Sequence, residues 1–405
     1  MRIPDFLQQY TASSSRLNIA YQTDILDHFD AFLRQICPNA KLLLITQPQY
    51  REYVESKLIH NLQSQGIETA YCLCNEQPGM PYAKQIEDSL SQDALNHIDA
   101  LVSFGDNALF HAVRTHATRL NRPCAAILDD FADAHALEPI GNEIPFPCGL
   151  FFDLNAIANR YKGKLSDPIH RLEIEVYSMT ADLFAFNAFN DKFDNILFDI
   201  LREAIPPCAL LKSPCNEDTL AQICESYAWL SIAHRIIHKK SKTSLEIVYE
   251  YAKNSTENLT LSPLRCARLL AQLFDAALEI ESLEIDPDAC AARQPPKEIL
   301  SRTLRQILLD DGVPFSWLKI ADENFEDRIT LKNELNSILL NWDEFSTNLR
   351  TITDVLRAIC TDAPDDADCD PALKTLWIHA GRFAPKHSFL KLFNDLGLIE
   401  PSLYL

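Results

Sequence analysis

A short turn between an apolar run and an amphipathic stretch is the first candidate for chemistry in this sequence. Gly105-Asp106-Asn107 follows the apolar residues 98–104 and opens a predicted helix over about 107–120. The free amides and the positive dipole end of a helix N-terminus favour an anion such as a phosphate. Asp106 puts a carboxylate there, which repels a phosphate but is a favourable helix cap. Two interpretations stay open, namely a cap without a nucleotide and an altered nucleotide site.

Two histidines four residues apart form a second candidate. His234 and His238 lie on a predicted helix over 219–239, and this spacing puts both rings on one helix face. Imidazoles are common zinc ligands, but a catalytic zinc site usually has three protein ligands. Because Lys239 and Lys240 follow, an exposed helix face without a metal is the competing interpretation.

The glycine content limits how many phosphate-binding loops the chain can form. Only nine glycines occur in 405 residues, whereas average usage would give about 28. Such loops need glycine because the backbone approaches the ligand closely and often has a positive φ. The composition therefore argues against a typical dinucleotide loop.

Charge and hydropathy exclude other classes of function. The 57 acidic and 37 basic residues give a net charge of -20, which repels nucleic-acid backbones. No segment approaches the ~20 apolar residues of a membrane span, and the N-terminus lacks a signal-peptide pattern. Twelve cysteines without a secretory signal indicate buried thiols in a reducing compartment. We therefore expect a cytoplasmic protein that does not bind nucleic acid and does not span a membrane.

The elements that position these residues alternate in the first part of the chain. Helical patterns at about 50–65, 81–93 and 107–120 separate strand-like apolar runs, and this predicts βαβ units around a parallel sheet. We predict a Rossmann-like α/β domain over residues 1–160 and an all-α domain over residues 161–405. The predicted strands lie at 41–46, 69–74, 98–104, 124–128 and 150–153.

Several segments, in this order, resemble the dehydroquinate synthase and iron-dependent alcohol dehydrogenase superfamily. Residues 98–114 are similar to the strand, glycine turn and helix that hold the cofactor pyrophosphate there. The superfamily has more glycines in that turn, and an Asp and a Lys where His111 and Arg114 stand. The resemblance spans roughly residues 25–340 and implies a dehydroquinate synthase-like fold. Further segments match at 122–127, 149–153, 180–186 and 327–331.

The resemblance implies a nucleotide and a substrate site. NAD or NADP would lie at Gly105, Asp106, Asn107 and His111. Residues 327–331 resemble a segment of glycerol-1-phosphate dehydrogenases, which makes Arg328 the implied partner of a substrate phosphate.

The resemblance also implies a divalent metal, zinc or iron. Asp182 corresponds to the first ligand, and His234 with His238 matches the spacing of the helix that carries the second. A second alignment instead puts Ile247 at that position, because residues 241–246 resemble the segment before the ligand helix. The last ligand, in a His-Gly pair, corresponds to Leu261-Ser262, which contains no histidine.

Two main hypotheses for the function follow. The first is an NAD(P)- and metal-dependent dehydrogenase that resembles glycerol-1-phosphate dehydrogenase and transfers hydride to a small phosphorylated ketone. The second is a catalytically degraded relative without cofactors that works through binding, as a homo-oligomer or with a protein partner. The scarce glycine, Asp106 and the missing last histidine favour the second. A dehydroquinate synthase-like lyase is a weaker third hypothesis, since it needs the same cofactors.

Overall fold

The chain forms two compact units. Unit 1 comprises Met1–Ile169 and Glu203–Lys239, and unit 2 comprises His170–Arg202 and Lys240–Leu405. The sequence predicted one boundary near residue 160, whereas the segment 203–239 returns to unit 1. The computed structural model describes residues 18–23, 25–36, 41–75, 81–89, 97–131, 148–162, 164–189, 196–205, 214–237, 242–255, 261–281, 284–361 and 371–399.

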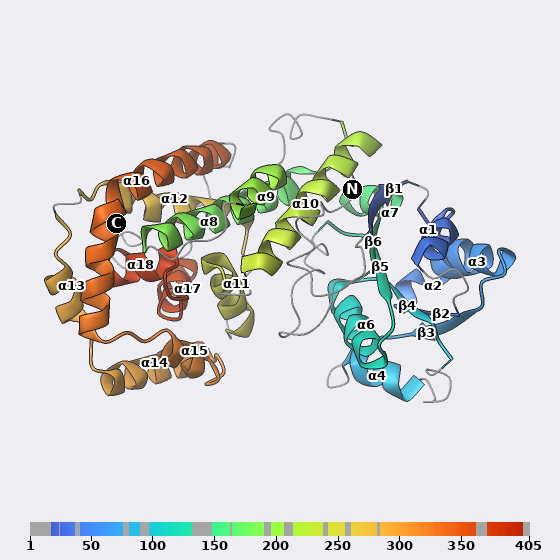
Figure 1. Ribbon diagram of the computed structural model, residues 1–405, viewed down its shortest axis with the longest axis horizontal. Helices are drawn as coiled ribbons and strands as arrows, with labels where there is room; N and C mark the ends of the chain where they lie inside the picture. The colour runs from blue at the N-terminus through green and yellow to red at the C-terminus, as the bar shows by residue number, and fades with distance from the viewer. Residues whose placement is uncertain are drawn as a thin grey trace. The chain divides into compact units, whose positions relative to one another are not determined.

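A six-stranded parallel sheet forms the centre of unit 1 (Figure 1). Its strands follow the order β1-β6-β5-β4-β2-β3. Every residue of β2, β4, β5 and β6 is buried, as expected for a parallel sheet with helices on both faces. The predicted Rossmann-like sheet is therefore confirmed, and β1 is an edge strand that the sequence patterns missed. The strands are β1 Asn18–Gln22, β2 Leu42–Thr46, β3 Thr69–Leu73, β4 Ala100–Phe104, β5 Cys124–Leu128 and β6 Gly149–Asp153.

Helices cover both faces of this sheet (Figure 1). On one face lie α1 (Phe29–Ile36), α2 (Arg51–Tyr53) and α3 (His60–Ser64), and on the other lie α4 (Tyr82–Ser89) and α6 (Asn107–Leu120). A 3-10 turn, η2 (Pro48–Tyr50), precedes α2, and a π-helical segment, η3 (Val54–Ile59), joins α2 to α3.

Two further helices pack near β1 in unit 1. These are α7 (Leu154–Tyr161) and α10 (Glu217–Ile237). The Tyr21 hydroxyl at the end of β1 donates a hydrogen bond to Glu225 of α10 over 3.2 Å. Contacts of this kind explain why segment 203–239 is part of unit 1, although its helical pattern placed it in the predicted all-α domain.

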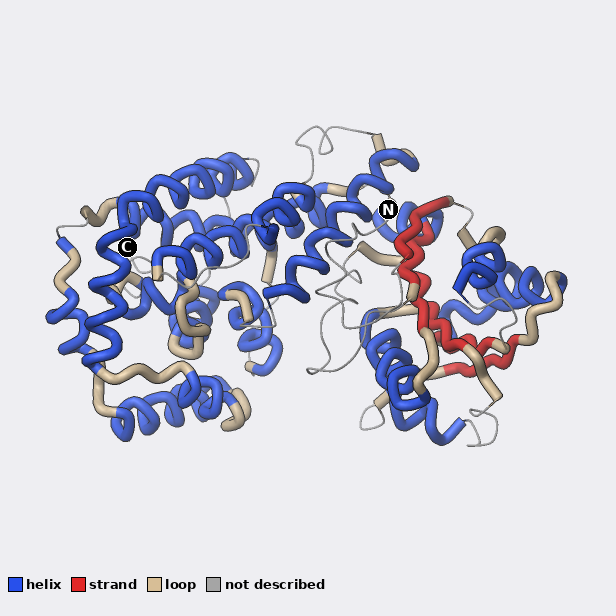
Figure 2. The backbone as a smooth tube through the Cα atoms, viewed as in Figure 1, coloured by secondary structure: helices blue, strands red, loops and turns tan. Residues whose placement is uncertain are grey.

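The described part of unit 2 consists of helices and connecting loops (Figure 2). Its core contains large aromatic side chains such as Trp342, Trp377 and Phe274, all fully or nearly fully buried. No described helix of the chain has the length and apolarity of a membrane span. The helices are α8 Ser166–Ala188, which begins in unit 1, α9 Ile196–Ala204, which ends there, α11 Ser244–Asn254, α12 Pro263–Leu278, α13 Pro287–Arg293, α14 Lys297–Asp311, α15 Trp317–Glu323, α16 Arg328–Thr361, α17 Pro371–Gly381 and α18 Phe389–Asp395.

The start of α11 is held by a reciprocal pair of hydrogen bonds. Thr243 Oγ1 accepts from the amide of Glu246 over 3.2 Å, and Glu246 Oε2 accepts from the amide of Thr243 over 2.6 Å. This capping box satisfies two amides that would otherwise have no partner in the helix.

We predict that Thr243→Ala lowers the free energy of unfolding of unit 2 by about 1 kcal/mol, the usual cost of losing an N-cap. Urea denaturation followed by circular dichroism measures the change. Thr347→Ala is the matched control, because that exposed hydroxyl bonds only the Asp343 carbonyl of its own helix. Equal losses in the two variants would contradict a specific role for the cap.

Candidate functional site

The carboxyl ends of β2 and β4 mark a point where the winding of the sheet reverses. These strands are neighbours, yet the helices that follow them, α2–α3 and α6, cover opposite faces of the sheet (Figure 1). Ligands of open parallel sheets bind at such a reversal, beyond the ends of the strands. Gln47 follows β2 here, and Gly105 and Asp106 follow β4.

Gly105 adopts a conformation that side chains disfavour. Its φ is +148°, and a Cβ atom at this position would lie 2.8 Å from Gln47 Oε1 and 3.2 Å from Leu109 Cδ2. In dinucleotide-binding turns a glycine lets the backbone approach the pyrophosphate. In this chain the glycine accommodates the side chain of Gln47 instead.

Asp106 caps α6. Its Oδ1 accepts a hydrogen bond from the Leu109 amide over 2.8 Å, and its Oδ2 accepts from the Tyr82 hydroxyl over 3.3 Å and from Gln47 Nε2. Gln47 Nε2 also donates to the Tyr82 oxygen over 2.7 Å. The structure confirms that Asp106 caps α6, and it places the side chain of Gln47 against the Asp106 carboxylate.

The four residues assigned to the nucleotide from the resemblance lie together at this helix start. Gly105 and Asp106 form the turn, Asn107 is the first residue of α6, and His111 follows one turn later. The His111 carbonyl accepts a hydrogen bond from Thr115 Oγ1 over 2.9 Å. Nucleotide binding at these residues stays a prediction.

Carboxylates also follow β5, the neighbour of β4. Asp129 Oδ2 accepts a hydrogen bond from the Tyr50 hydroxyl over 2.5 Å, and it lies 3.1 Å from Arg160 Nη1. Arg160 Nε lies 2.9 Å from Asp130 Oδ2, so a single guanidinium bridges both carboxylates. Asp129 Oδ1 is buried and has no hydrogen-bond partner among the described residues. The net charge of this group is negative, which disfavours phosphates.

Another carboxylate lies at the end of β6, the strand next to β5. Asp153 ends β6, caps α7 through the Ala156 amide at 3.0 Å, and accepts from the Tyr53 hydroxyl over 2.8 Å. Burial raises the pKa of Asp153, although these hydrogen bonds oppose the increase. The sequence did not predict the roles of Tyr50 and Tyr53. The one sequence feature that could have indicated these roles is the presence of two tyrosines one helical turn apart just after a predicted strand.

A cavity of 520 Å³ opens at the same edge of the sheet, among β1, α2 and α7. Its lining carries both charges, with Lys57 and Arg160 as cations and Asp27 and Asp129 as anions. The remaining lining residues are Thr23, Leu26, Tyr50, Tyr53, Asn155, Ala156 and Asn159.

Asp182, the first metal ligand implied by the resemblance, is fully buried in unit 2. Its Oδ1 accepts hydrogen bonds from Ser244 Oγ over 2.6 Å and from the Phe389 amide over 3.1 Å. Its Oδ2 accepts from the Ser244 amide over 2.7 Å. Burial raises the pKa of Asp182 to about 7, while the bonds from Ser244 and Phe389 oppose the increase. Since Ser244 opens α11 and Phe389 opens α18, the carboxylate joins two helix N-termini.

The contact with Ser244 bears on the two alignments of the second metal ligand. Asp182 contacts the first residue of α11, the helix that carries Ile247. Ile247 is buried at 1% exposure and offers no ligand atom. His234 lies on α10 in unit 1 and is also buried, whereas His238 lies outside the described residues.

Arg328, the predicted phosphate partner, is the exposed first residue of α16. Its Nε donates a hydrogen bond to the Gln294 carbonyl over 2.9 Å. Binding of a substrate phosphate by Arg328 stays a prediction.

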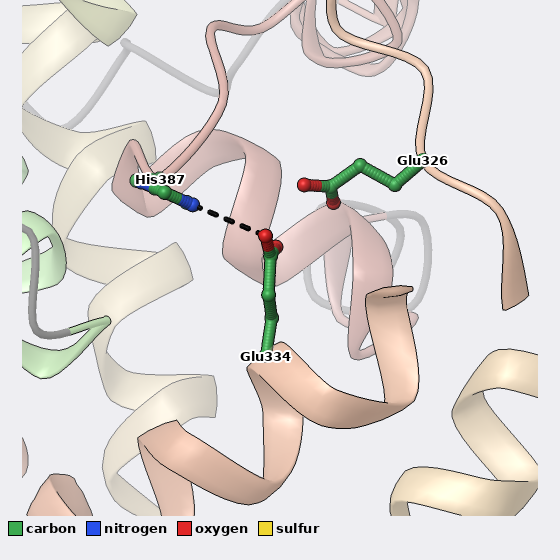
Figure 3. Close-up of side chains that lie close together, drawn as sticks. All are labelled: Glu326, Glu334 and His387. Atoms are coloured by element: carbon green, nitrogen blue, oxygen red, sulfur yellow. Dashed lines mark hydrogen bonds and ion pairs between the residues drawn. The ribbon is translucent and has the colours of Figure 1, made fainter. Parts of the chain in front are cut away.

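Glu326, Glu334 and His387 form a cluster that the sequence patterns did not indicate (Figure 3). One possible ligand atom from each lies within 4.8 Å of the others. However, the Lys386 ammonium lies 2.7 Å from Glu326 Oε1 and 2.7 Å from Glu334 Oε1. His387 Nε2 lies 3.4 Å from that same Glu334 oxygen. The lysine supplies the positive charge that a metal would bring, so we interpret the cluster as a structural ion-pair network.

Burial and hydrogen bonding give the two carboxyl groups of this cluster different pKa values. Burial raises the pKa of Glu326 to about 7, and the hydrogen bond with Glu334 adds to the increase. Burial acts in the same direction on Glu334, but hydrogen bonds with His387, Glu326 and Lys386 outweigh it and lower its pKa to about 2. The network also stabilises His387 at a φ of +63°, which is uncommon for a residue other than glycine.

Comparison with solved structures identifies the fold. An archaeal halo-thermophilic alcohol dehydrogenase from a Red Sea brine pool superposes with a TM-score of 0.51 at 10% identity, over 97% of this chain and 98% of that one. The chain has the fold of the dehydroquinate synthase-like and iron-containing alcohol dehydrogenase superfamily. The fold implied by the sequence resemblance is therefore confirmed.

Two other solved structures of this superfamily are similar at lower scores. An iron-containing alcohol dehydrogenase from Corynebacterium glutamicum has a TM-score of 0.48 at 13% identity, over 85% of this chain and 98% of that one. A probable glycerol dehydrogenase from Sinorhizobium meliloti has a TM-score of 0.45 at 11% identity, over 86% and 98%. No protein-family model and no curated protein matches the sequence.

We predict that Gly105→Ala destabilises unit 1 by roughly 3 kcal/mol, because it combines an unfavourable φ with a contact against Gln47. Gly66→Ala is the matched control, since Gly66 has a φ of +75° but no atom near the position of a Cβ. Thermal unfolding should show a smaller loss for Gly66→Ala. Adding Gln47→Ala to Gly105→Ala should recover part of the stability, and no recovery would contradict the proposed contact.

Glu173 generates a prediction about pH. Its carboxyl group on α8 is 6% exposed, its Oε2 has no hydrogen-bond partner among the described residues, and burial raises its pKa to about 7. The folded state therefore binds more protons than the unfolded state between about pH 4.5 and 7. As a result, this group's contribution to stability is present at low pH and is lost as pH rises through 7.

We expect Glu173→Gln to stabilise the protein by about 1–2 kcal/mol at pH 8 and to have little effect at pH 5. Thermal unfolding at the two pH values measures this difference. Glu344→Gln on the exposed face of α16 serves as the control and should change neither value. A stabilisation by Glu173→Gln that is equal at both pH values would contradict the titration argument.

Proposed function

We propose that this chain is a relative of the dehydrogenases that has lost metal-dependent hydride transfer and acts through binding. The observation that carries the proposal is the state of the Asp182 carboxylate. Both of its oxygens accept hydrogen bonds from Ser244 or Phe389 inside the core of unit 2. A metal at this carboxylate would have to displace donors that cap two helices.

The other positions of the metal site support the same proposal. A catalytic zinc site usually has three protein ligands. In the alignment that places α11 at the ligand helix, Ile247 stands at the second ligand, and Leu261-Ser262, just before α12, stands at the last. Since isoleucine and leucine offer no ligand atoms, these residues do not fit a zinc or iron ion.

The nucleotide turn is also altered in a way that supports the proposal. The Leu109 amide at the start of α6 is used by the Asp106 carboxylate, and Gln47 fills the space beside Gly105. A pyrophosphate at the turn would meet the Asp106 carboxylate, and this contact between negative charges is unfavourable.

A second candidate function is favoured by the fold itself, which matches an alcohol dehydrogenase over 97% of this chain. In this alternative the chain is an NAD(P)- and metal-dependent oxidoreductase that resembles glycerol-1-phosphate dehydrogenase and reduces a small phosphorylated ketone. Asp182 and His234 would hold the metal, and Arg328 would bind the substrate phosphate. A lyase of the dehydroquinate synthase type requires the same metal and nucleotide, so it meets the same objections.

Metal analysis and nucleotide titration distinguish the two functions. For protein purified without chelators, we expect far less than one zinc or iron per chain by plasma mass spectrometry. Isothermal titration with NADH and with NADPH, each with added zinc or ferrous iron, should show no heat of binding. A stoichiometric metal together with micromolar nucleotide affinity would establish the dehydrogenase and overturn our proposal.

We further predict that Asp182→Asn lowers the free energy of unfolding by about 2 kcal/mol, because an amide nitrogen must face one of the three donors. Ser244→Ala, which removes one donor and leaves the carboxylate, should cost less. Neither variant should change the metal content. A fall in bound metal in Asp182→Asn alone would show that Asp182 is a ligand.

A further inference from the structure

The cluster of Glu326, Glu334 and His387 joins two parts of unit 2 that are distant in the sequence (Figure 3). Glu326 lies just before α16 and Glu334 lies on α16, whereas His387 belongs to the turn 385–388, which leads into α18. His387 has a φ of +63°, which is uncommon for a residue with a side chain. The cluster therefore attaches an irregular turn to the start of a long helix.

Side chains of the turn make this attachment. The Lys386 ammonium lies 2.7 Å from Glu326 Oε1 and 2.7 Å from Glu334 Oε1. His387 Nε2 lies 3.4 Å from the same Glu334 oxygen, and the ring of Phe189 stacks on the imidazole with 4.6 Å between the centroids. The shortest of these contacts are those of Lys386 with the two carboxyl groups.

The charges of the cluster do not balance when every carboxyl group is ionised. Glu326 and Glu334 share the single ammonium group of Lys386. The next lysine, Lys391, lies 3.8 Å from Glu326, but it is 2.6 Å and 2.5 Å from the two oxygens of Asp395. Three carboxylates against two lysines leave one negative charge in excess.

Burial makes this excess charge unfavourable. The side chain of Glu326 is 5% exposed and that of Glu334 is 19% exposed. Two ionised carboxylates in one buried site repel each other, and burial adds a desolvation cost to each. One proton bound by the cluster removes the excess charge. The geometry therefore favours a carboxyl pair that shares one proton in the folded protein.

The pKa values indicate which group binds this proton. Burial, followed by the hydrogen bond with Glu334, raises the pKa of Glu326 from its ordinary 4.5 to about 7, although two lysines oppose the increase. Glu334, whose pKa is lowered to about 2, stays ionised. The charged and titratable groups that face Glu326 from the described elements are Glu334 of α16, Lys386 and His387 of the turn, and Lys391 of α18, with Asp395 beyond that lysine.

Loss of the proton weakens the attachment of the turn. Because folded Glu326 binds a proton more tightly than the unfolded chain does, its contribution is fully present below about pH 4.5 and is lost as pH rises through about 7. Once Glu326 is ionised, it repels Glu334 while both groups depend on Lys386. Since Glu334 is part of a helix of 34 residues, the turn is the element that yields.

We propose that this cluster is a proton-dependent latch, in which the protonated pair of Glu326 and Glu334 fixes the turn 385–388 to α16 and release of the proton loosens the turn. The latch goes beyond the function proposed above and does not depend on it, because no metal and no nucleotide takes part.

Hydrogen exchange of the full chain, followed by mass spectrometry at about pH 5 and about pH 8 and corrected for the intrinsic exchange rate, tests the latch. We expect Glu326→Gln, which cannot ionise, to match the wild type at pH 5 and to protect the amides of the turn at least about tenfold better at pH 8. This comparison isolates Glu326, because every other titratable group, including Asp182, is the same in both proteins. Equal protection of the turn in both proteins at pH 8 would overturn the proposal.

Glu344→Gln is the matched control, since Glu344 is exposed on the same helix. It should exchange like the wild type at both pH values. A gain in this control as large as that in Glu326→Gln would show an effect of net charge alone and would overturn the latch.

The dependence of exchange on urea shows whether the turn opens locally. A local opening exposes little surface, so low urea concentrations should hardly accelerate exchange in the turn at pH 8, whereas they should accelerate exchange in α12. The same dependence on urea in both segments would mean that the turn exchanges only when unit 2 unfolds, which would overturn the latch.

Two further variants locate the proton and provide a second test if Glu326→Gln fails to fold. Glu334→Gln leaves one carboxylate for Lys386, so it should reduce the loss of protection between pH 5 and pH 8 by at least about tenfold. His387→Asn, which tolerates a positive φ, should keep the full loss. An undiminished loss in Glu334→Gln would overturn the proposal. So would a loss that disappears in His387→Asn, because the proton would then belong to the imidazole.

Discussion

The structure of unit 2 depends on one buried carboxylate. Asp182 lies on α8, and its oxygens accept hydrogen bonds from residues that open α11 and α18. These residues are 62 and 207 positions away in the sequence, so the carboxylate connects distant parts of the chain. A negative charge at two helix N-termini is favourable, and it satisfies amides that the helices themselves leave without partners. The cost is desolvation, which appears as the raised pKa of Asp182.

The hydrogen bonds of Asp182 give this carboxylate a structural role, because they hold the start of α11 and the start of α18 together. The side chain of Ile247, one turn into α11, is buried at 1% exposure and belongs to the core of unit 2. Internal contacts also occupy the turn after β4 in unit 1. Gln47 lies against Gly105, which has a φ of +148°, and the Asp106 carboxylate accepts a hydrogen bond from the Leu109 amide.

Acidic residues lie at the ends of three neighbouring strands, and a tyrosine hydroxyl donates a hydrogen bond at each of them. Tyr50 and Tyr53, at the start of the helical segment after β2, reach across the sheet to Asp129 and Asp153. These bonds satisfy carboxylates at the edge where ligands of open parallel sheets bind.

The sequence alone was sufficient to predict the parallel sheet, because β2, β4 and β5 are short apolar runs and helices with regular periodicity separate them. It also predicted the cap at Asp106, which depends on local contacts three residues apart. The edge strand β1 has a weaker hydrophobic pattern than the central strands. Segment 203–239 packs against the sheet through tertiary contacts such as that of Tyr21 with Glu225. Neither feature can be deduced from local periodicity.

Only the tertiary structure decided which groups meet. It joined Asp182 to Ser244, the first residue of α11, and it brought Gln47 against Gly105. It also assembled the cluster of Glu326, Glu334 and His387. The physical reason is that hydrophobic periodicity reports which face of an element is buried, whereas a site depends on contacts between residues far apart in the chain. The amino-acid sequence therefore determined the architecture, and the packing of its helices determined what that architecture can bind.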